Sequence, residues 1–240
     1  MSHGEATRLI AVRHGETAWN VEARLQGQLD IPLNDRGREQ ALRTAHWLAD
    51  DAPDVVVSSD LARAQATAHA IASFNRIPLE LDAGLRERHF GSFQGMTHTE
   101  VAERWPDLSA RWKSRDPEFV PGVTGDGESL TVFYARCVDA ALRVAMRHAG
   151  RTVVLVAHDD VLDCLYRAAS RVPLDAPRIW QLDNAAINRL LHTSSGLTMV
   201  GWNDTSHLDV HAPTLDESAD RMPAAAALAA TITADVGRAG

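Results

Sequence analysis

An arginine, a histidine and a glycine directly follow a short apolar run, and their chemistry is that of an anion site. Leu9 to Val12 is typical of a buried strand, and it ends at Arg13, His14 and Gly15. Glycine permits a turn that other residues resist, so a cation and an imidazole are left at the carboxyl edge of the strand. Ligands of open α/β sheets bind at this edge. A neutral imidazole is a competent nucleophile toward phosphorus, and a guanidinium fork can hold phosphoryl oxygens.

Three further polar residues stand beside predicted strand ends elsewhere in the chain. Arg63 follows the run 54–58 and falls in the first turn of a predicted helix, where unpaired amides already attract anions. Glu87 lies between two arginines, and His158 follows the strongly apolar run 152–157. Each residue also has an ordinary interpretation: a surface arginine, an exposed ion pair of little energetic weight, or a hydrogen-bonded histidine. Because the separated positions have matching chemistry, we favour one common phosphate site.

Strands that alternate with helices must position these side chains. Apolar and β-branched runs predict strands at 9–12, 54–58, 79–81, 152–157, 186–191 and 197–202. Helical periodicity predicts helices at 35–49, 61–74, 97–105, 129–148 and 161–169. We therefore expect an α/β protein with three α/β/α layers, in which helices cover both faces of a mostly parallel central sheet. Residues 18–30 are expected to form a loop.

The pattern along the chain predicts one catalytic domain and a tail. We assign residues 1–211 to a single domain. Within it, the weakly patterned segment at about 88–127 is expected to be a lid or cap, because long irregular segments of compact domains are often functional. Residues 212–240 drift to an Ala-rich composition and are expected to be a frayed C-terminal tail.

Composition and charge exclude several classes of protein. The net charge of −8 argues against a general nucleic-acid binder. No apolar run approaches the roughly 18 residues that a membrane span needs, and residues 1–8 lack the apolar core of a signal peptide. Cys137 and Cys164 form no close-spaced pair, so we expect reduced, buried thiols, no metal site and a cytoplasmic location. The choice between a monomer and a homodimer stays open.

The ordered set of motifs resembles the histidine phosphatase superfamily, which includes the cofactor-dependent phosphoglycerate mutases. The similarity runs from Leu9 to His207, and its signature is Arg13-His-Gly-Glu-Thr17. The remaining motifs follow in the family's order: Trp19-Asn20, Arg24-Leu-Gln-Gly27, Pro32-Leu-Asn34, Gly37, Gln40-Ala41, Ser59-Asp-Leu-Ala-Arg-Ala64, Glu87 with Gly91, Gly127-Glu-Ser129 and Ala157-His158. The signature alone is moderately specific, whereas the ordered set is highly specific.

The resemblance implies a phosphoglycerate mutase-like fold and a role for each residue of the site. His14 is the implied nucleophile and becomes phosphohistidine. Glu87 is implied to protonate the leaving oxygen and later to help activate water. Arg13, Arg63 and His158 are implied to clamp the oxygens of the transferring phosphoryl group. No metal or cofactor is needed in this scheme, because guanidiniums and a second imidazole neutralise the charge.

A second group of residues is expected to bind the substrate. The resemblance implies that Asn20 hydrogen-bonds the phosphoryl group, and Gln26 and Gly27 belong to the same run of motifs. Cationic and imidazole side chains that we expect at the mouth of the site are Arg24, Arg88, His98, Arg111 and Arg115. The expected partner is a small phosphorylated molecule, with no nucleic acid and no membrane.

Departures from the family pattern leave alternative functions open. The family usually has glycine after its second histidine, whereas Asp159 and Asp160 follow His158. A carboxylate about 5 Å from a phosphoryl oxygen would repel it by roughly 3 kcal/mol at an effective dielectric of about 20, although aspartate is also a good helix N-cap. Phe90 and His98 stand where mutases have a tyrosine and a lysine. We therefore predict a metal-independent phosphomonoester hydrolase, with a cofactor-dependent mutase or a catalytically weakened phospho-ligand binding protein as alternatives.

Overall fold

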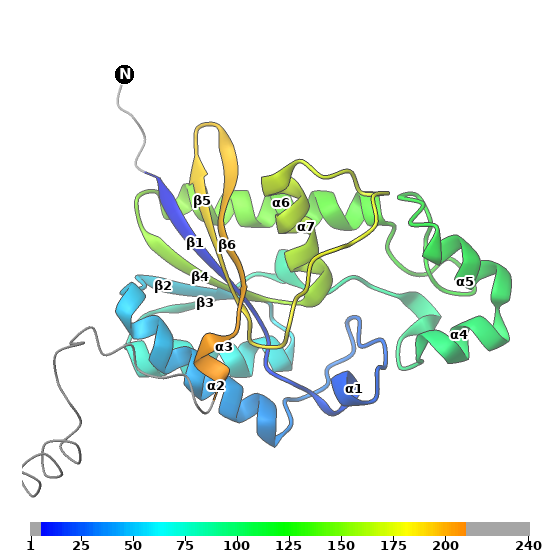
Figure 1. The fold of residues 1–240 in the computed structure, drawn as a ribbon, viewed down its shortest axis with the longest axis horizontal. Coiled ribbons are helices and arrows are strands. Elements are labelled where there is room, and N and C mark those ends of the chain that lie inside the picture. The colour runs from blue at the N-terminus through cyan, green and yellow to red at the C-terminus, as the bar shows by residue number, and fades with distance from the viewer. Residues whose placement is uncertain (1–5, 210–240) are drawn as a thin grey trace, which may run out of the picture. The chain divides into compact units, whose positions relative to one another are not determined.

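A six-stranded sheet runs through the middle of the computed structural model, which describes residues 6–209 (Figure 1). Its strands are β1 (Thr7–Arg13), β2 (Val55–Ser58), β3 (Leu79–Leu81), β4 (Thr152–Ala157), β5 (Ile187–Thr193) and β6 (Gly196–Asp204). Their order across the sheet is β3-β2-β4-β1-β5-β6. The first four of these are mutually parallel, while β5 is antiparallel to β1 and β6 to β5. The prediction of a mostly parallel sheet is confirmed.

Helices cover both faces of this sheet, as the alternation of elements predicts. On one face, Ile10 and Val12 of β1 pack with α2 (Asp35–Trp47) and α3 (Ala62–Asn75). On the other face, Leu9 and Ala11 pack with α6 (Leu130–Arg147) and α7 (Asp159–Ser170). Every residue of β4 is buried, which explains its unbroken apolar run. The three-layer α/β/α fold is confirmed.

Several helix boundaries differ from the prediction. Residues 18–30 are not all loop, since α1 (Ala18–Val21) starts at a Thr17 capping box. The short helix α4 (His98–Arg104) is followed by α5 (Pro106–Lys113), which the sequence pattern does not indicate. The helix α7 begins at Asp159, directly after His158 and two residues earlier than expected. Acidic residues favour a helix N-terminus, so the two aspartates extend the helix toward the strand end.

The segment 88–127 has a small apolar cluster of its own. Phe90, Phe93 and Val101 are buried there together with Leu25, and Trp105 and Trp112 pack against them. The ring centroids of Phe93 lie 5.6 Å from those of both tryptophans. Figure 1 shows α4 and α5 side by side, beyond the sheet on the side where α1 lies. This cluster gives the segment a fixed shape although its sequence has little periodicity.

Two further expectations concern membranes and the tail. Of the helices in residues 6–209, none has both the length and the apolar character needed to cross a membrane. The predicted tail 212–240 and the predicted domain end at residue 211 lie outside the described residues. Residues 6–209 also contain short 3-10 helices, which are Leu48–Asp51, Ala83–Leu85, Gly91–Phe93 and Ser206–Leu208.

Candidate active site

The parallel pairing of β1 with β4 brings two distant histidines together. Arg13 pairs with Ala157 in the register, so the residues that follow them leave the sheet at the same edge. The His14 backbone N–H donates to the Ala157 carbonyl over 3.0 Å. The ring centroids of His14 and His158 lie 5.2 Å apart with an interplanar angle of 58°. Both rings are buried at this edge of the sheet.

The hydrogen bonds of His14 define which of its nitrogens is free to react. Its Nδ1 lies 2.7 Å from the Gly15 carbonyl oxygen, which can only accept, so Nδ1 carries the proton. Its Nε2 accepts from Arg63 Nε over 3.3 Å. Burial, with the charges of Arg63 and Arg13, lowers the pKa of His14 well below its usual range. The ring is therefore neutral at physiological pH, and the lone pair of its unprotonated Nε2 is directed at the Arg63 guanidinium.

Two glycines allow the turn after His14 to fit against the start of α2. A Cβ on Gly15 would lie 2.3 Å from the Gly37 carbonyl oxygen, and a Cβ on Gly37 would lie 2.0 Å from that of Glu16. Both distances are far inside van der Waals contact with backbone atoms that cannot move away. This close approach fixes the position of the nucleophile candidate and explains the glycines at both positions.

Arg63 is a fixed cation beside His14. It lies in the first turn of α3 and is completely buried. Its Nη1 donates to the Leu29 carbonyl over 2.9 Å, and its Nη2 donates to the Gly27 carbonyl over 2.7 Å. Burial lowers the pKa of Arg63 to about 10, so the side chain stays charged at neutral pH. Because two carbonyls hold its guanidinium, Arg63 needs no reorganisation to stabilise an anion near His14.

His158 presents a ring nitrogen with no protein partner. Its Nε2 lies 2.8 Å from Ser59 Oγ, and that hydroxyl oxygen accepts from the Leu61 backbone N–H over 3.3 Å. In the described part of the chain the buried Ser59 hydroxyl has no other acceptor, so we assign its proton to His158 Nε2, which places the ring proton on Nδ1. Within residues 6–209 this buried Nδ1 has no hydrogen-bond partner. Burial, followed by the charge of Arg63, lowers the pKa of His158, so the ring is a neutral donor.

Glu87 has the properties of a protonated acid. Its side chain is buried, and Oε1 accepts from the Arg88 backbone N–H over 2.9 Å. Burial and the nearby Asp160 carboxylate raise the pKa of Glu87 to about 8. A carboxyl group of this kind keeps its proton at neutral pH and can give it to a leaving oxygen.

Asp159 lies between two guanidiniums rather than free in the site. Its Oδ1 is 3.3 Å from Arg13 Nη1, and Arg178 Nη1 donates to its Oδ2 over 2.5 Å. Burial opposes the ionisation of Asp159, but Arg13 and Arg178 outweigh burial and hold its pKa below the usual range. The sequence predicts that this carboxylate repels phosphate, and the structure adds that Asp159 pairs with Arg13, the cation that was expected to bind phosphate.

A cavity of about 390 Å³ opens above these residues. Predicted site residues that line it are Arg13, His14, Asn20, Arg24, Gln26, Gly27, Arg63, Glu87, His98 and Arg115. The predicted site residue His158 does not line it, although its ring lies 5.2 Å from that of His14, measured between the centroids. Asn20 also has a structural task, since its Oδ1 accepts from the Thr17 backbone N–H over 3.0 Å.

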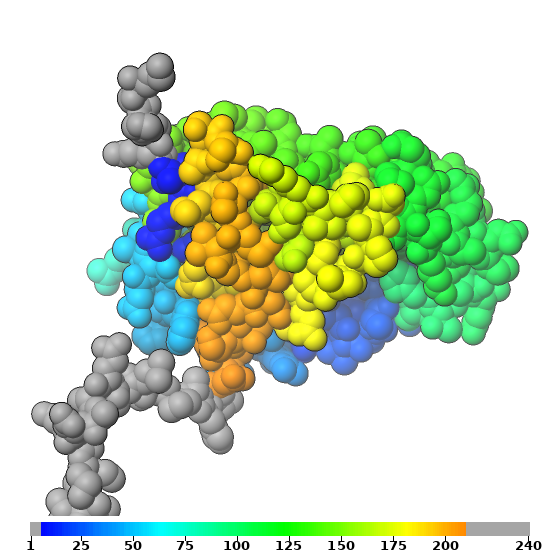
Figure 2. All heavy atoms as spheres, turned by 45° about the horizontal axis from the view of Figure 1, so that its top comes forward, coloured from blue at the N-terminus to red at the C-terminus, as the bar shows by residue number. Residues whose placement is uncertain are grey.

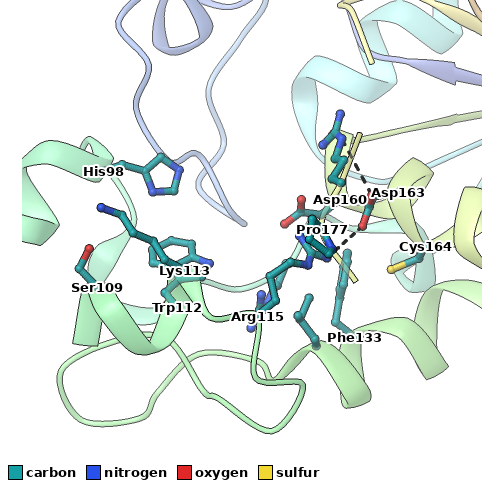
Figure 3. Close-up of a pocket in the computed structure, with 13 residues that line it drawn as sticks. His98, Ser109, Trp112, Lys113, Arg115, Phe133, Asp160, Asp163, Cys164 and Pro177 are labelled. Atoms are coloured by element: carbon teal, nitrogen blue, oxygen red, sulfur yellow. Dashed lines mark hydrogen bonds and ion pairs between the residues drawn. The ribbon is translucent and has the colours of Figure 1, made fainter. Parts of the chain in front are cut away.

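A second cavity of about 330 Å³ adjoins the first, and the residues that line both are His98, Trp112, Arg115, Asp160 and Arg178. Figure 3 shows Asp160 and Asp163 on one side of this second cavity and His98 and Lys113 on the other. Arg88 lines this cavity and not the first, and its guanidinium is held by the Glu128 and Phe119 carbonyls.

Other residues expected at the substrate mouth take part in structural contacts. Arg24 lines the first cavity while it forms an ion pair with Glu22 over 2.8 Å. Arg111 lines neither cavity. Its guanidinium lies over the Phe119 ring and 3.8 Å from Asp116. Charge alone therefore does not identify the residues that face the site.

The sequence pattern does not identify two residues of the site. Arg178 lines both cavities, and Asn184 donates to the His14 carbonyl over 3.1 Å. Both lie in the segment 171–186, which has no helical or strand periodicity. Figure 2 shows this segment (yellow) on the surface between β5 and β6 (orange) and the α4–α5 region (green). Such contacts are tertiary, so no local sequence signal could have identified them.

Comparisons with known proteins point to one family. The family model described as histidine phosphatase superfamily (branch 1) matches residues 9–205. The chain is 37% identical to the metal-independent phosphoserine phosphatase of Arabidopsis thaliana over 207 residues, which is 85% of this chain and 84% of the relative. It is 37% identical to phosphoglycerate mutase-like protein 4 of the same plant over 204 residues, 84% and 86% of the two chains. The solved mycobacterial glucosyl-3-phosphoglycerate phosphatase superimposes with a TM-score of 0.74 and 32% identity, over 84% of this chain and all of that one.

Proposed function

Since the chain belongs to the histidine phosphatase superfamily, we propose that it is a metal-independent phosphomonoester hydrolase that works through a phosphohistidine on His14. The observation that carries this proposal is the state of His14. Its ring is neutral, its Nδ1–H is fixed by the Gly15 carbonyl, and its Nε2 points at the buried cation of Arg63. This arrangement offers an attacking lone pair and a positive charge to the same phosphoryl group.

In the first step Nε2 of His14 attacks phosphorus, and the bond from phosphorus to the leaving oxygen breaks. The leaving oxygen takes the proton of Glu87, so the alcohol departs neutral. Arg63 and the Nδ1–H of His158 donate to phosphoryl oxygens, and Arg13 joins them when the phosphoryl group competes with Asp159 for its guanidinium. These fixed donors stabilise the charge that develops in the transition state.

In the second step water attacks the phosphohistidine. Glu87, now a carboxylate, accepts a proton of this water, and the bond between phosphorus and Nε2 of His14 breaks. Inorganic phosphate leaves, and both His14 and Glu87 return to their starting states. The chain therefore needs one acid that alternates with its conjugate base, which fits a carboxyl group whose pKa is raised to about 8.

The substrate in this proposal is a small phosphorylated molecule. Asn20, Gln26, Gly27 and Arg24 line the first cavity and are assigned to its binding. The segment 88–127 is assigned the role of a cap, since its residues reach both cavities. The relatives named as phosphoserine and glucosyl-3-phosphoglycerate phosphatases support hydrolysis of such compounds. Because Cys137 and Cys164 are both free thiols, a cytoplasmic location is part of the proposal.

The test compares wild type with His14→Ala in two assays. Hydrolysis of p-nitrophenyl phosphate by wild type, lost in His14→Ala, supports the hydrolase. Interconversion of phosphoglycerates that requires catalytic bisphosphoglycerate, at a rate above hydrolysis, would show the mutase instead. Phosphate binding without turnover would show a binding protein, and the pairing of Asp159 with Arg13 would then be the physical reason for the missing catalysis.

A further inference from the structure

Two carboxylates face the cavity beside His14 without a cation bound to either. The backbone N–H of Asp160 lies 3.5 Å from Glu87 Oε2, and both side chains line this cavity. Within residues 6–209 neither carboxylate forms an ion pair, and that of Asp160 has no hydrogen-bond partner. By contrast, its neighbours on α7 form ion pairs: Asp159 pairs with Arg178 and Asp163 with Arg167. Asp160 is thus an acid without an ion-pair partner next to the predicted proton donor.

The cations around Glu87 are engaged elsewhere. Arg63 of α3 binds the carbonyls of residues 27 and 29, and Arg88 binds those of residues 119 and 128. Arg136 of α6 donates to the backbone carbonyl of Glu87, while its main partner is the Glu128 carboxylate at 2.8 Å. The imidazole rings of His14 and His158, which directly follow β1 and β4, are neutral. Arg13 and Arg178, which line the same cavity, both pair with Asp159. Among the aspartates of α7, within the described residues, Asp160 is the one without an ion-pair partner.

We infer that Asp160 is a positioning residue of the active site, whose carboxylate keeps the proton on Glu87 until the leaving oxygen takes it. Like charges at close range disfavour a second ionisation, so the two acids hold one proton between them. Burial, followed by the charges of Asp159 and Asp163, raises the pKa of Asp160 to about 6, although Arg88 and Arg178 act in the opposite direction. This value is below that of about 8 for Glu87. Between these pH values Asp160 is charged and Glu87 carries the proton.

This role serves both steps of the proposed reaction, on which the kinetic part of the inference rests. When the bond to the leaving oxygen breaks, Glu87 loses its proton and becomes a second negative charge beside Asp160. The repulsion makes Glu87 a stronger base for the proton of the water that attacks phosphohistidine. Taking that proton relieves the repulsion and restores the starting pair. The fixed charge of Asp160 thus keeps Glu87 protonated before the reaction and favours its reprotonation afterwards.

The direct test titrates Glu87 in the full-length protein without substrate. The glutamate side-chain carboxyls are labelled with ¹³C, and the resonance missing from Glu87→Gln identifies Glu87. Asp160→Asn removes the charge, and Asp160→Ser removes it with a smaller side chain if the amide disturbs folding. Asp160→Glu keeps the charge as the matched control. We expect the Glu87 midpoint to fall by at least about one pH unit in the two neutral variants and to stay high in Asp160→Glu.

A Glu87 midpoint that stays at the wild-type value in a folded neutral variant would overturn the inference. The kinetic readout is the alkaline limb of kcat/KM for an alkyl phosphate, which needs a protonated leaving oxygen. This limb should move to lower pH together with the midpoint. A loss of rate that is equal at all pH values, with the limb in place, would show a structural role and refute the inference. If wild type neither hydrolyses phosphomonoesters nor becomes phosphorylated, the proposed function fails, whereas the titration still decides on Asp160.

Discussion

The substitution Asp159→Asn removes the two effects that we expect Asp159 to have on phosphate binding. Its carboxylate pairs with Arg13 and Arg178, so it competes with an incoming phosphoryl group for Arg13 and also repels it. The asparagine has the same shape but no charge. Binding of a phosphate dianion should therefore become tighter, because Arg13 and Arg178 then act on the ligand alone.

The size of this effect follows from the geometry. Arg13 Nη1 lies 3.3 Å from Asp159 Oδ1, so a phosphoryl oxygen on the same guanidinium would lie about 5 Å from the carboxylate. Two unit charges at this distance interact by about 3 kcal/mol at an effective dielectric of about 20. Arg178 also pairs with Asp159, and the carboxylate is 28% exposed to water, so we expect less than half of this repulsion energy to remain. About 1 kcal/mol corresponds to a roughly fivefold change in affinity.

The assay is the competitive inhibition constant of inorganic phosphate, measured with p-nitrophenyl phosphate as substrate. This constant should fall about fivefold in Asp159→Asn, and KM should fall with it while kcat changes less. The matched variant Arg178→Gln removes the partner instead of the acid, so its inhibition constant should rise. An unchanged or higher constant in Asp159→Asn would refute the reasoning, since Asp159 would then neither repel phosphate nor withhold Arg13 from it.

Further expectations concern pH, stability and the cap. Because burial and Arg63 lower the pKa of His14, the ring stays neutral at pH 6.5, and a pH–rate profile of kcat/KM should fall only at lower pH, where His14 gains a proton. Arg63→Met leaves the carbonyl of the buried Gly27 without its donor, at about 1–3 kcal/mol, and urea unfolding should show the lower stability. Phe93→Ala removes a fully buried ring from the aromatic cluster of the cap, at about 3–5 kcal/mol, and amide exchange in α4 and α5 should accelerate.

The parts of the fold that the sequence predicts are those with strong periodicity and large burial. β4 is buried at every position and α6 has an apolar face at helical spacing, so both are recognised from the chain alone. The eight residues of α5 start at Pro106 and contain a single fully buried residue, Ser109. Such a helix depends on its tertiary contacts, which leave little trace in the local pattern.

The residues of the site likewise divide into those that a local sequence pattern indicates and those that depend on tertiary contacts. His14, Arg63 and His158 stand next to strand ends or helix starts, and the sheet register dictates their convergence. Arg88 and Arg178 are both arginines of weakly patterned segments, yet their guanidiniums differ in surroundings. The first is held by two carbonyls, and the second bridges Asp159 to the cavities. Only the packing of distant segments distinguishes them, so the sequence could not.

The most direct test of the account is the chemical identity of the reaction intermediate. Wild-type protein is mixed with p-nitrophenyl phosphate, whose leaving group departs without a proton. The reaction is quenched in alkali, where phosphohistidine is stable, and the protein is digested for tandem mass spectrometry. We predict one added phosphoryl group on His14 and none in His14→Asn, with trapping strengthened in Glu87→Gln because water is then activated poorly. Turnover without any phosphorylated histidine, or a phosphoryl group on another residue, would contradict the account.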